Sequence, residues 1–331
     1  METIDLYPVP FVRKWGYIDK EGNMVIEPKF EGGFDFTDGL AAFYGSNGKC
    51  GFINKRGEVV IEPNFYIIGG FEHGTAPVTL ESNEYRDNVI SFIDKSGNIV
   101  ANTDFRYVYS FREGLCSVSS DAEKYGYIDT ELNLVIKEQF ATAGNFNEGL
   151  AAFQFETNSK YGYIDKSGNV VIEPKFYWAC EFSEGLAAAQ DSKSFKWSYI
   201  DKQGNYVIEP QYYGPGRFID GLASVGIEGS DGKVKYGYID KNDNVIIEPA
   251  FTFAREFSEG LAAVEVNINE GKEDSLPENK WGYIDKTGDL VIPPQYDSAT
   301  EFKNGVAIVY LLNKSMNGYI NNKGEYIWEP R

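Results

Sequence analysis

One ten-residue motif recurs nine times along the chain, and this repetition constrains the fold more than any other feature of the sequence. The copy that begins at Lys160 reads KYGYIDKSGN, and the copy that begins at Lys280 reads KWGYIDKTGD. A second block follows each of the first eight copies, as in FSEGLAA over residues 182–188. Successive copies start 35 to 45 residues apart, which is typical of repeat proteins whose units bury their apolar faces against their neighbours.

The repeats account for nearly all 331 residues, so we predict a single repeat array over residues 1–331. Residues 1–13 form an N-terminal capping segment, in which Pro8 and Pro10 confine a lone strand over 7–12 to a sheet edge. The repeats cover approximately 14–48, 49–88, 89–123, 124–159, 160–195, 196–234, 235–279 and 280–315. A C-terminal half-repeat follows over 316–331.

Each repeat has the pattern of short antiparallel strands. Residues 161–165 alternate in the manner of a strand, residues 165–168 have the composition of a tight turn, and 170–172 form the returning strand. Pro174 ends that strand, Phe176 and Phe182 bracket a bend, and 186–188 give a third extended segment. The pattern therefore predicts three strands per repeat and no helix.

A hairpin of this size is marginally stable alone, so we expect neighbouring repeats to stack, with the isoleucine column that includes Ile164 as the core. We predict an all-β fold, with the repeats stacked as an open superhelical solenoid. A closed, propeller-like ring is the alternative, although it needs about nine blades of ~36 residues, whereas propellers usually have 4–8 blades of ~40–45 residues.

The repeated unit resembles the WG-repeat (KWG repeat) family of bacterial proteins, whose unit reads KWGYID-x-x-G-x-x-VI-x-P-x-[FY] and then F-x-x-GLA-x-V. The resemblance implies an all-β repeat fold and little about activity, because most members have none assigned. Two places depart from the pattern: residues 101–103 read ANT instead of Ile-Glu-Pro, and Leu132 replaces the turn glycine. We expect a different turn at Leu132, because a left-handed backbone is costly for leucine.

Composition excludes several classes of function. The chain has 31 Lys+Arg against 50 Asp+Glu and a net charge of −19, which opposes binding to nucleic-acid phosphates. Its three cysteines lack the spacing of a zinc site or disulfide framework. No apolar run is long enough for a membrane span, so we expect no membrane insertion and a cytoplasmic protein, with signal-independent export left open.

An acidic column precedes the glycine of the second block and is our candidate partner-binding surface. Its members are Asp38, Glu113, Glu148, Glu184, Asp220 and Glu259, with His73 and Asn304 at the same position in two repeats. In the functional interpretation, these charges bind a basic segment of a partner protein. In the structural interpretation, they form turns or a solvated face. Insertions fall at one seam between repeats, and the longest, over 267–279, adds Glu270, Glu273 and Asp274 as candidates.

Other columns have structural explanations. The aspartates represented by Asp165 either cap their turns or, as the alternative, bind calcium. The aromatic columns either pack between layers or form platforms for sugars. His73 is the only histidine and sits in a repeat column, and no catalytic motif occurs. We therefore predict no catalytic, cofactor-binding or metal-binding residues, and no cofactor.

These observations favour a non-enzymatic binding scaffold that recognises a protein partner with a basic surface through repeat edges and insertion loops. The first alternative is a carbohydrate or cell-envelope binding module that uses exposed aromatics. A second alternative is an enzyme with an unrecognised site, for which only His73 and the cysteines could supply the reactive group.

Overall fold

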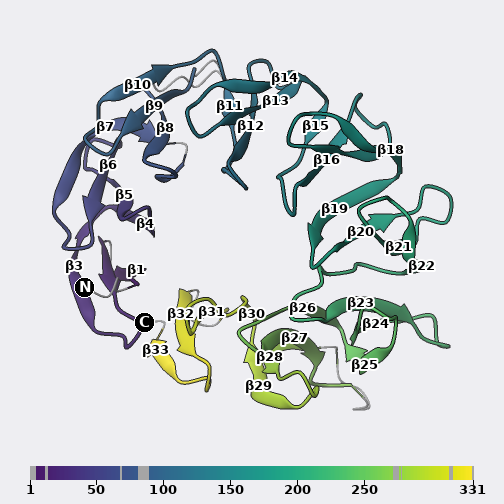
Figure 1. Cartoon of the computed structure of the whole chain (residues 1–331). Coiled ribbons are helices and arrows are strands. Elements are labelled where there is room, and N and C mark those ends of the chain that lie inside the picture. The colour runs from purple at the N-terminus through teal and green to yellow at the C-terminus, as the bar shows by residue number, and fades with distance from the viewer. Residues whose placement is uncertain are drawn as a thin grey trace. The chain divides into compact units, whose positions relative to one another are not determined.

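The computed structural model describes residues 5–11, 14–67, 69–80, 89–270, 276, 278–312 and 316–329. These residues form strands, bridges, turns and bends, with no α-helix (Figure 1). No helix in this part of the chain is therefore long and apolar enough to cross a membrane. Contacts divide the chain into two compact units: residues 1–158 with 165–169, and residues 159–164 with 170–331.

The first unit contains sixteen strands among its described residues, all paired antiparallel. They are β1 (Tyr7–Phe11), β2 (Lys14–Ile18), β3 (Met24–Phe30), β4 (Gly32–Thr37), β5 (Leu40–Tyr44), β6 (Cys50–Asn54), β7 (Val59–Ile67), β8 (Thr75–Thr79), β9 (Ser91–Asp94), β10 (Ile99–Asn102), β11 (Tyr107–Val108), β12 (Leu115–Ser119), β13 (Tyr125–Asp129), β14 (Leu134–Phe140), β15 (Thr142–Ala143) and β16 (Leu150–Gln154).

The second unit repeats the same arrangement. Its strands are β17 (Tyr161–Asp165), β18 (Val170–Phe176), β19 (Trp178–Ser183), β20 (Leu186–Gln190), β21 (Trp197–Ile200), β22 (Tyr206–Tyr212), β23 (Ala223–Glu228), β24 (Val234–Ile239), β25 (Val245–Phe251), β26 (Phe253–Ser258), β27 (Leu261–Asn267), β28 (Asn279–Ile284), β29 (Leu290–Tyr296), β30 (Ser298–Ala299), β31 (Val306–Leu311), β32 (Met316–Asn321) and β33 (Tyr326–Trp328).

The complete sheet has four strands, as in β19-β20-β21-β22 and β26-β27-β28-β29. The prediction of three strands per repeat was therefore wrong where the supposed bend, Trp178–Ser183, pairs as β19 with β20. A β-bulge between Ala179 and Phe182 interrupts the pairing, so the segment lacks the simple alternation of a regular strand. The fourth strand is shorter elsewhere: β11, β15 and β30 have two residues each.

Each four-stranded sheet combines two sequence repeats. Its first two strands come from the second block of one repeat, and its last two are the hairpin of the next repeat, as when β19 and β20 join β21 and β22. The strands β4 to β10 instead form one continuous seven-stranded sheet, because β7 pairs with both β6 and β8. The half-repeat at the C-terminus supplies the hairpin β32–β33 that completes β30–β31. The expected N-terminal strand is β1, an edge strand paired with β2 from Tyr7↔Ile18 to Phe11↔Lys14.

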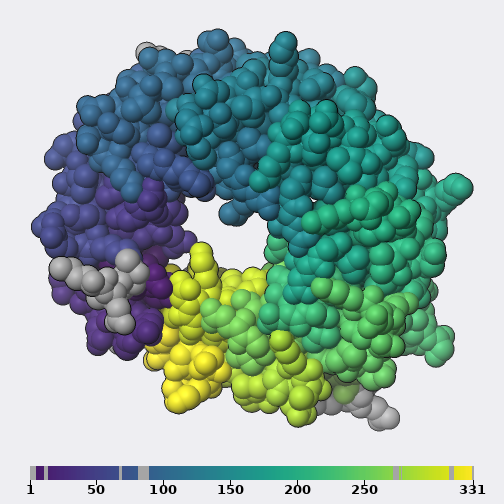
Figure 2. All heavy atoms as spheres, in the orientation of Figure 1, coloured from purple at the N-terminus to yellow at the C-terminus, as the bar shows by residue number. Residues whose placement is uncertain are grey.

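Consecutive sheets stack within each unit, in direct contact at the surface (Figures 1 and 2). The isoleucines of the repeated motif, Ile164 among them, are completely buried in every repeat, as predicted. The tyrosines that precede them, such as Tyr163, are buried on the opposite face. Both faces of a sheet therefore carry core residues, and the predicted all-β array of tandem antiparallel repeats is confirmed.

The hairpin turn is the same in all regular repeats. The N–H of Gly168 donates to the carbonyl of Asp165, and Gly168 adopts a positive φ of 81°. The expectation of a different turn at Leu132 was wrong: Leu132 has φ 67°, and its N–H donates to the carbonyl of Asp129. The same side-chain cap from Asp129 and the same strand register hold this turn in place.

Candidate functional site

The acidic column lies in the tight turns that connect the first two strands of each sheet. Glu113 has φ 50° and Gly114 has φ 85°, and Glu184 and Gly185 show the same pair of values, 52° and 88°. Two successive positive φ angles are typical of a type I′ hairpin turn, which matches the twist of its strands. The column therefore forms turns, as its structural explanation requires.

The side chain of Glu113 joins its sheet to the next one. Its carboxylate accepts hydrogen bonds from the N–H of Glu148 at 2.7 Å and of Gly149 at 3.0 Å. Lys166, from the hairpin of that same neighbouring sheet, lies 3.1 Å from Oε2 and also donates to the Glu113 carbonyl at 2.9 Å. One carboxylate thus satisfies turn amides and a lysine across the sheet-to-sheet contact.

Similar contacts recur along each unit, and we call the set the acid–turn ladder. Its rungs join Asp38 to Gly74 and Lys95, Glu113 to Glu148, Gly149 and Lys166, Glu184 to Gly221 and Lys241, Asp220 to Lys286, and Glu259 to Asn304 and Gly305. In each rung that has a lysine, the lysine lies two repeats after the acid. In one rung both residues are replaced: His73 stands at the acid position, and Thr130, two repeats later, stands at the lysine position.

The ladder favours ionised carboxylates. The hydrogen bond from Lys95, reinforced by the N–H of Gly74, lowers the pKa of Asp38. Burial acts to raise the pKa of Glu113, but Lys166 and the two turn amides outweigh it and lower the pKa overall. These carboxylates already have partners within the chain, so an incoming cation must compete with them.

The remaining predicted partner-binding residues are less regular. Glu148 contributes its amide to the ladder, and Glu270 forms an ion pair with Lys235 at 2.9 Å. Glu273 and Asp274 lie outside the described residues. Partner binding by this set stays a prediction, and the contacts above give most of its members a structural role.

The aspartate column caps turns. Asp165 Oδ1 accepts the N–H groups of Ser167 and Asn169 at 2.9 Å each, and Oδ2 accepts from the Asn169 side chain at 3.0 Å. The equivalent hydrogen bonds at Asp94, from the Asn98 amide first, lower the pKa of that carboxyl. The described residues contain no group of three acidic, cysteine or histidine side chains suited to a metal ion.

The tyrosine column is also structural. Tyr163 is fully buried, and its hydroxyl donates to the carbonyl of Cys180, 17 residues further on, at 2.7 Å. Tyr17, Tyr127, Tyr199, Tyr238 and Tyr283 make the equivalent bond. In two repeats a phenylalanine, Phe52 or Phe92, replaces the tyrosine, and without a hydroxyl it cannot donate this hydrogen bond.

The reactive-residue candidates have unfavourable surroundings for catalysis. Burial raises the pKa of the Cys116 thiol to about 12 and that of Cys180 to about 11, so both stay protonated near neutral pH. Cys50 is buried. His73 is exposed, with its ring edge-on to Phe111 at 5.6 Å between centroids.

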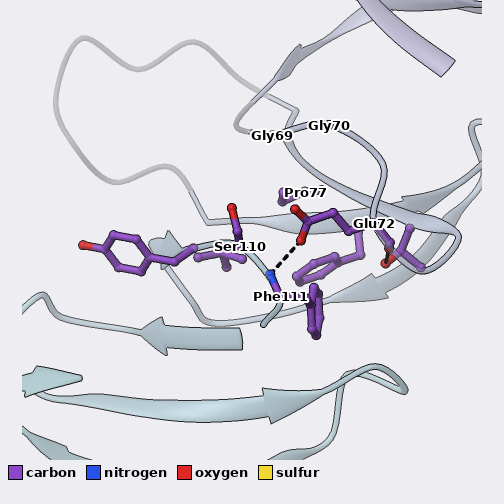
Figure 3. A pocket seen from close by; sticks show the side chains of 10 residues that line it. Gly69, Gly70, Glu72, Pro77, Ser110 and Phe111 are labelled. Atoms are coloured by element: carbon purple, nitrogen blue, oxygen red, sulfur yellow. Dashed lines mark hydrogen bonds between the residues drawn. The ribbon is translucent and has the colours of Figure 1, made fainter. Parts of the chain in front are cut away.

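A small pocket of about 50 Å³ opens in the first unit, where β7 leads to β8 (Figure 3). Phe92, Val108 and Pro77 give it apolar walls, and Glu72 and Ser110 supply polar groups. One Glu72 oxygen accepts the N–H of Phe111 at 2.6 Å. Sequence reasoning did not identify this pocket, although it lies where several residues depart from the repeat pattern.

Sequence reasoning also missed a surface on the second strand of each hairpin, the return strand. Two adjacent apolar residues at its start are exposed in most repeats, each with 36–51% of its surface accessible. They are Val25, Val59, Val60, Ile99, Val100, Leu134, Val135, Val170, Val171, Tyr206, Val207, Val245, Ile246, Leu290, Val291 and Tyr326. The signal was the repeated VVIEP segment, which places two apolar residues side by side where a half-buried strand would alternate.

Comparison with known families identifies the repeated unit. The family model described as "WG containing repeat" matches residues 15–50, 51–83, 90–122, 125–156, 161–192, 197–229, 236–269 and 281–314. The chain belongs to the WG-repeat family. No curated protein matches the sequence.

A solved structure shares the fold of this WG-repeat protein at low identity. A crystal structure of a eukaryotic initiation factor is 11% identical, with a TM-score of 0.65 over 98% of this chain and 95% of that chain. At that identity the likeness shows the fold alone. A computationally designed protein, Ika8 (10% identity, TM-score 0.46, 88% and 94% covered), and an uncharacterized protein of Listeria monocytogenes (12%, 0.43, 80% and 93%) score below 0.5 and support no inference.

Proposed function

We propose that this WG-repeat protein is a non-enzymatic scaffold that binds a protein partner through its return strands. The observation that carries the proposal is the pair of exposed apolar residues repeated at the same register in successive return strands. Exposed apolar residues that gather in a patch are typical of interaction surfaces, whereas scattered ones are ordinary. We call these pairs, together with the glutamates described next, the return-strand surface.

Acidic groups with no partner adjoin the apolar pairs. Val171 and Glu173 are two residues apart in β18, so they lie on one face of the strand. Glu27, Glu62, Glu173, Glu209 and Glu248 are exposed, and among the described residues their side chains make no hydrogen bond or ion pair. This combination is suited to a partner that presents basic and apolar side chains.

Recognition through side chains is also favoured by the strand itself. β18 is the edge strand of its sheet and continues through Pro174 to Phe176, so the prediction that Pro174 ends the strand was wrong. Pro174 has no N–H to donate, which an edge strand tolerates. Proline and exposed charge on an edge strand oppose the addition of another strand. A partner would therefore contact the apolar and acidic side chains rather than extend the sheet.

The proposal is tested by affinity capture from lysate of the source cells, with identification by mass spectrometry. The bait variant carries Val170→Thr, Val171→Thr and Val207→Thr, which keep the shape and strand preference of valine but remove apolar surface. A control bait carries Thr142→Val, a change outside the surface. We expect a specific protein that the wild type and control capture and the triple variant loses; equal capture by all three baits rejects the surface.

A carbohydrate-binding role is the second candidate, and one observation favours it. Trp178 is half exposed and packs against Tyr161, while Tyr177 and Phe195 form an exposed edge-to-face pair nearby in the sequence. Exposed aromatic rings can stack on sugars. Titration with cell-envelope glycans should then quench or shift tryptophan fluorescence in the wild type and less in Trp178→Ala; no change with any glycan removes this candidate.

A further inference from the structure

The pocket of the first unit exists because this part of the chain departs from the repeat pattern. In six repeats a tyrosine hydroxyl donates to the carbonyl 17 residues further on, as Tyr163 does to Cys180. Phe92 has no hydroxyl, and the corresponding carbonyl, that of Tyr109, receives the Cys116 thiol at 2.9 Å instead. Phe92 and Tyr109 both line the pocket.

Small and rigid residues widen the space further. Gly69 and Gly70 stand where the regular fifth repeat has Cys180 and Glu181. Pro77 replaces the second alanine of the GLA block and forms a wall. A Cβ on Gly69 would lie only 3.2 Å from Cγ of Pro77, so a side chain there would narrow the opening.

The polar end of the pocket is acidic. Glu72 Oε2 accepts the Phe111 N–H, and the Glu72 side chain forms no ion pair among the described residues. Ser110, also at the polar end, is exposed. Apolar walls that lead to a carboxylate are suited to an alkyl chain that ends in a positive charge.

We propose that this pocket binds a primary alkylammonium group, the side chain of a lysine on the partner protein. The methylene chain packs against Phe92, Pro77 and Val108, and the ammonium group pairs with the free oxygen of Glu72 and with the Ser110 hydroxyl. This inference rests on the proposed function, because the lysine would belong to the protein partner. Binding of a lysine side chain in the pocket can nevertheless be measured without that partner.

The experiment is a ¹H–¹⁵N NMR titration of the full chain with Nα-acetyl-lysine amide, and with the uncharged Nα-acetyl-norleucine amide for comparison. We expect saturable shifts of the Ser110 and Phe111 amides with the lysine amide, at least tenfold weaker with the norleucine amide. Phe92→Tyr restores the family's tyrosine and fills the pocket, so it should weaken binding at least tenfold.

Two further variants separate charge from fold. Glu72→Gln keeps an oxygen for the Phe111 N–H and should also weaken binding at least tenfold, whereas the control Glu123→Gln, at an exposed residue outside both the pocket and the return-strand surface, should leave it unchanged. Equal binding of both amides, or full binding by Phe92→Tyr, overturns the proposal. If a partner is captured but the lysine amide does not bind, only the proposal of a lysine-binding pocket is rejected. If the lysine amide binds but no partner is captured, only the proposal of a protein-binding scaffold is rejected.

Discussion

Leu132 and Ala101, from two successive repeats, pack against the same core cluster. Leu132 is larger than the glycine of the family pattern at its position, and Ala101 is smaller than the isoleucine at its position. In a regular pair, a Cβ on the turn glycine Gly168 would lie 3.1 Å from Cγ2 of Ile136 in the preceding repeat. Ala101 stands at that isoleucine position and Leu132 at the glycine position. The two departures are therefore one compensated exchange of volume between neighbours.

This relationship predicts strong coupling between the two sites. Leu132→Gly should remove buried side-chain contacts, and Ala101→Ile should overpack the cluster, at about 1–3 kcal/mol for overpacking. The double variant recreates the regular pair, so we expect it to be more stable than the sum of the single changes predicts, by about 1 kcal/mol or more. Urea unfolding of all four proteins measures the coupling, and strict additivity contradicts it.

The acid–turn ladder predicts a local effect of losing one rung. Glu113→Ala leaves the N–H groups of Glu148 and Gly149 without their acceptor, at a cost of about 0.5–1 kcal/mol after allowance for solvent screening. Hydrogen exchange at those two amides should quicken, while the exposed control Glu123→Ala should leave them unchanged. Unaltered exchange in Glu113→Ala would mean that the rung contributes nothing.

The tyrosine column predicts that one hydroxyl contributes measurably to stability. Tyr163→Phe leaves the Cys180 carbonyl without its donor, and an unpaired buried acceptor costs about 1–3 kcal/mol. The exposed control Tyr177→Phe loses no such bond and should match the wild type in thermal midpoint. If the thermal midpoint of Tyr163→Phe equals those of the wild type and Tyr177→Phe, water replaces the lost hydroxyl as the donor and the prediction is wrong.

Acid should destabilise the protein through its turn-capping carboxylates. The N–H of Ser194, with further hydrogen bonds, lowers the pKa of Asp191 to about 2, and Asp94 and Asp240 shift in the same direction. A lowered folded pKa contributes stability that is present above the unfolded value, about 3.9, and is lost as pH falls through the folded value. We expect stability to decline from about pH 5 to pH 2, and Asp191→Asn to decline less steeply; NMR titration of the Asp191 carboxyl tests its pKa directly.

Sequence patterns predicted the repeated parts of the fold well because those parts depend on local chemistry. Asp165 and Gly168 specify their turn, and the buried Ile164 marks the core without any tertiary information. The fourth strand was missed because the bulge at Ala179–Phe182 hides its alternation. The turn at Leu132 was mispredicted because its side chain packs against a core cluster that it shares with Ala101, a residue of another repeat.

The functional surfaces were harder to predict for the same reason. The acidic column is visible in the sequence, but only the stacking of sheets shows that Glu113 reaches Gly149 and Lys166. The pocket depends on Phe92 and Glu72, which meet through contacts between repeats. Exposure of Val170 and Val171 together accompanies a β-bulge, in which Val170 pairs with Ile164 and Ile172 pairs with Tyr163.

The central claim is that the return strands bind the partner while the acid–turn ladder serves the fold. The most direct test is the affinity of the captured partner, purified, for the wild type, for Val170→Thr with Val171→Thr and Val207→Thr, and for Glu113→Gln. We predict at least tenfold weaker binding by the triple variant and wild-type binding by Glu113→Gln. Full binding by the triple variant together with loss in Glu113→Gln would contradict the account and make the acidic column the binding site.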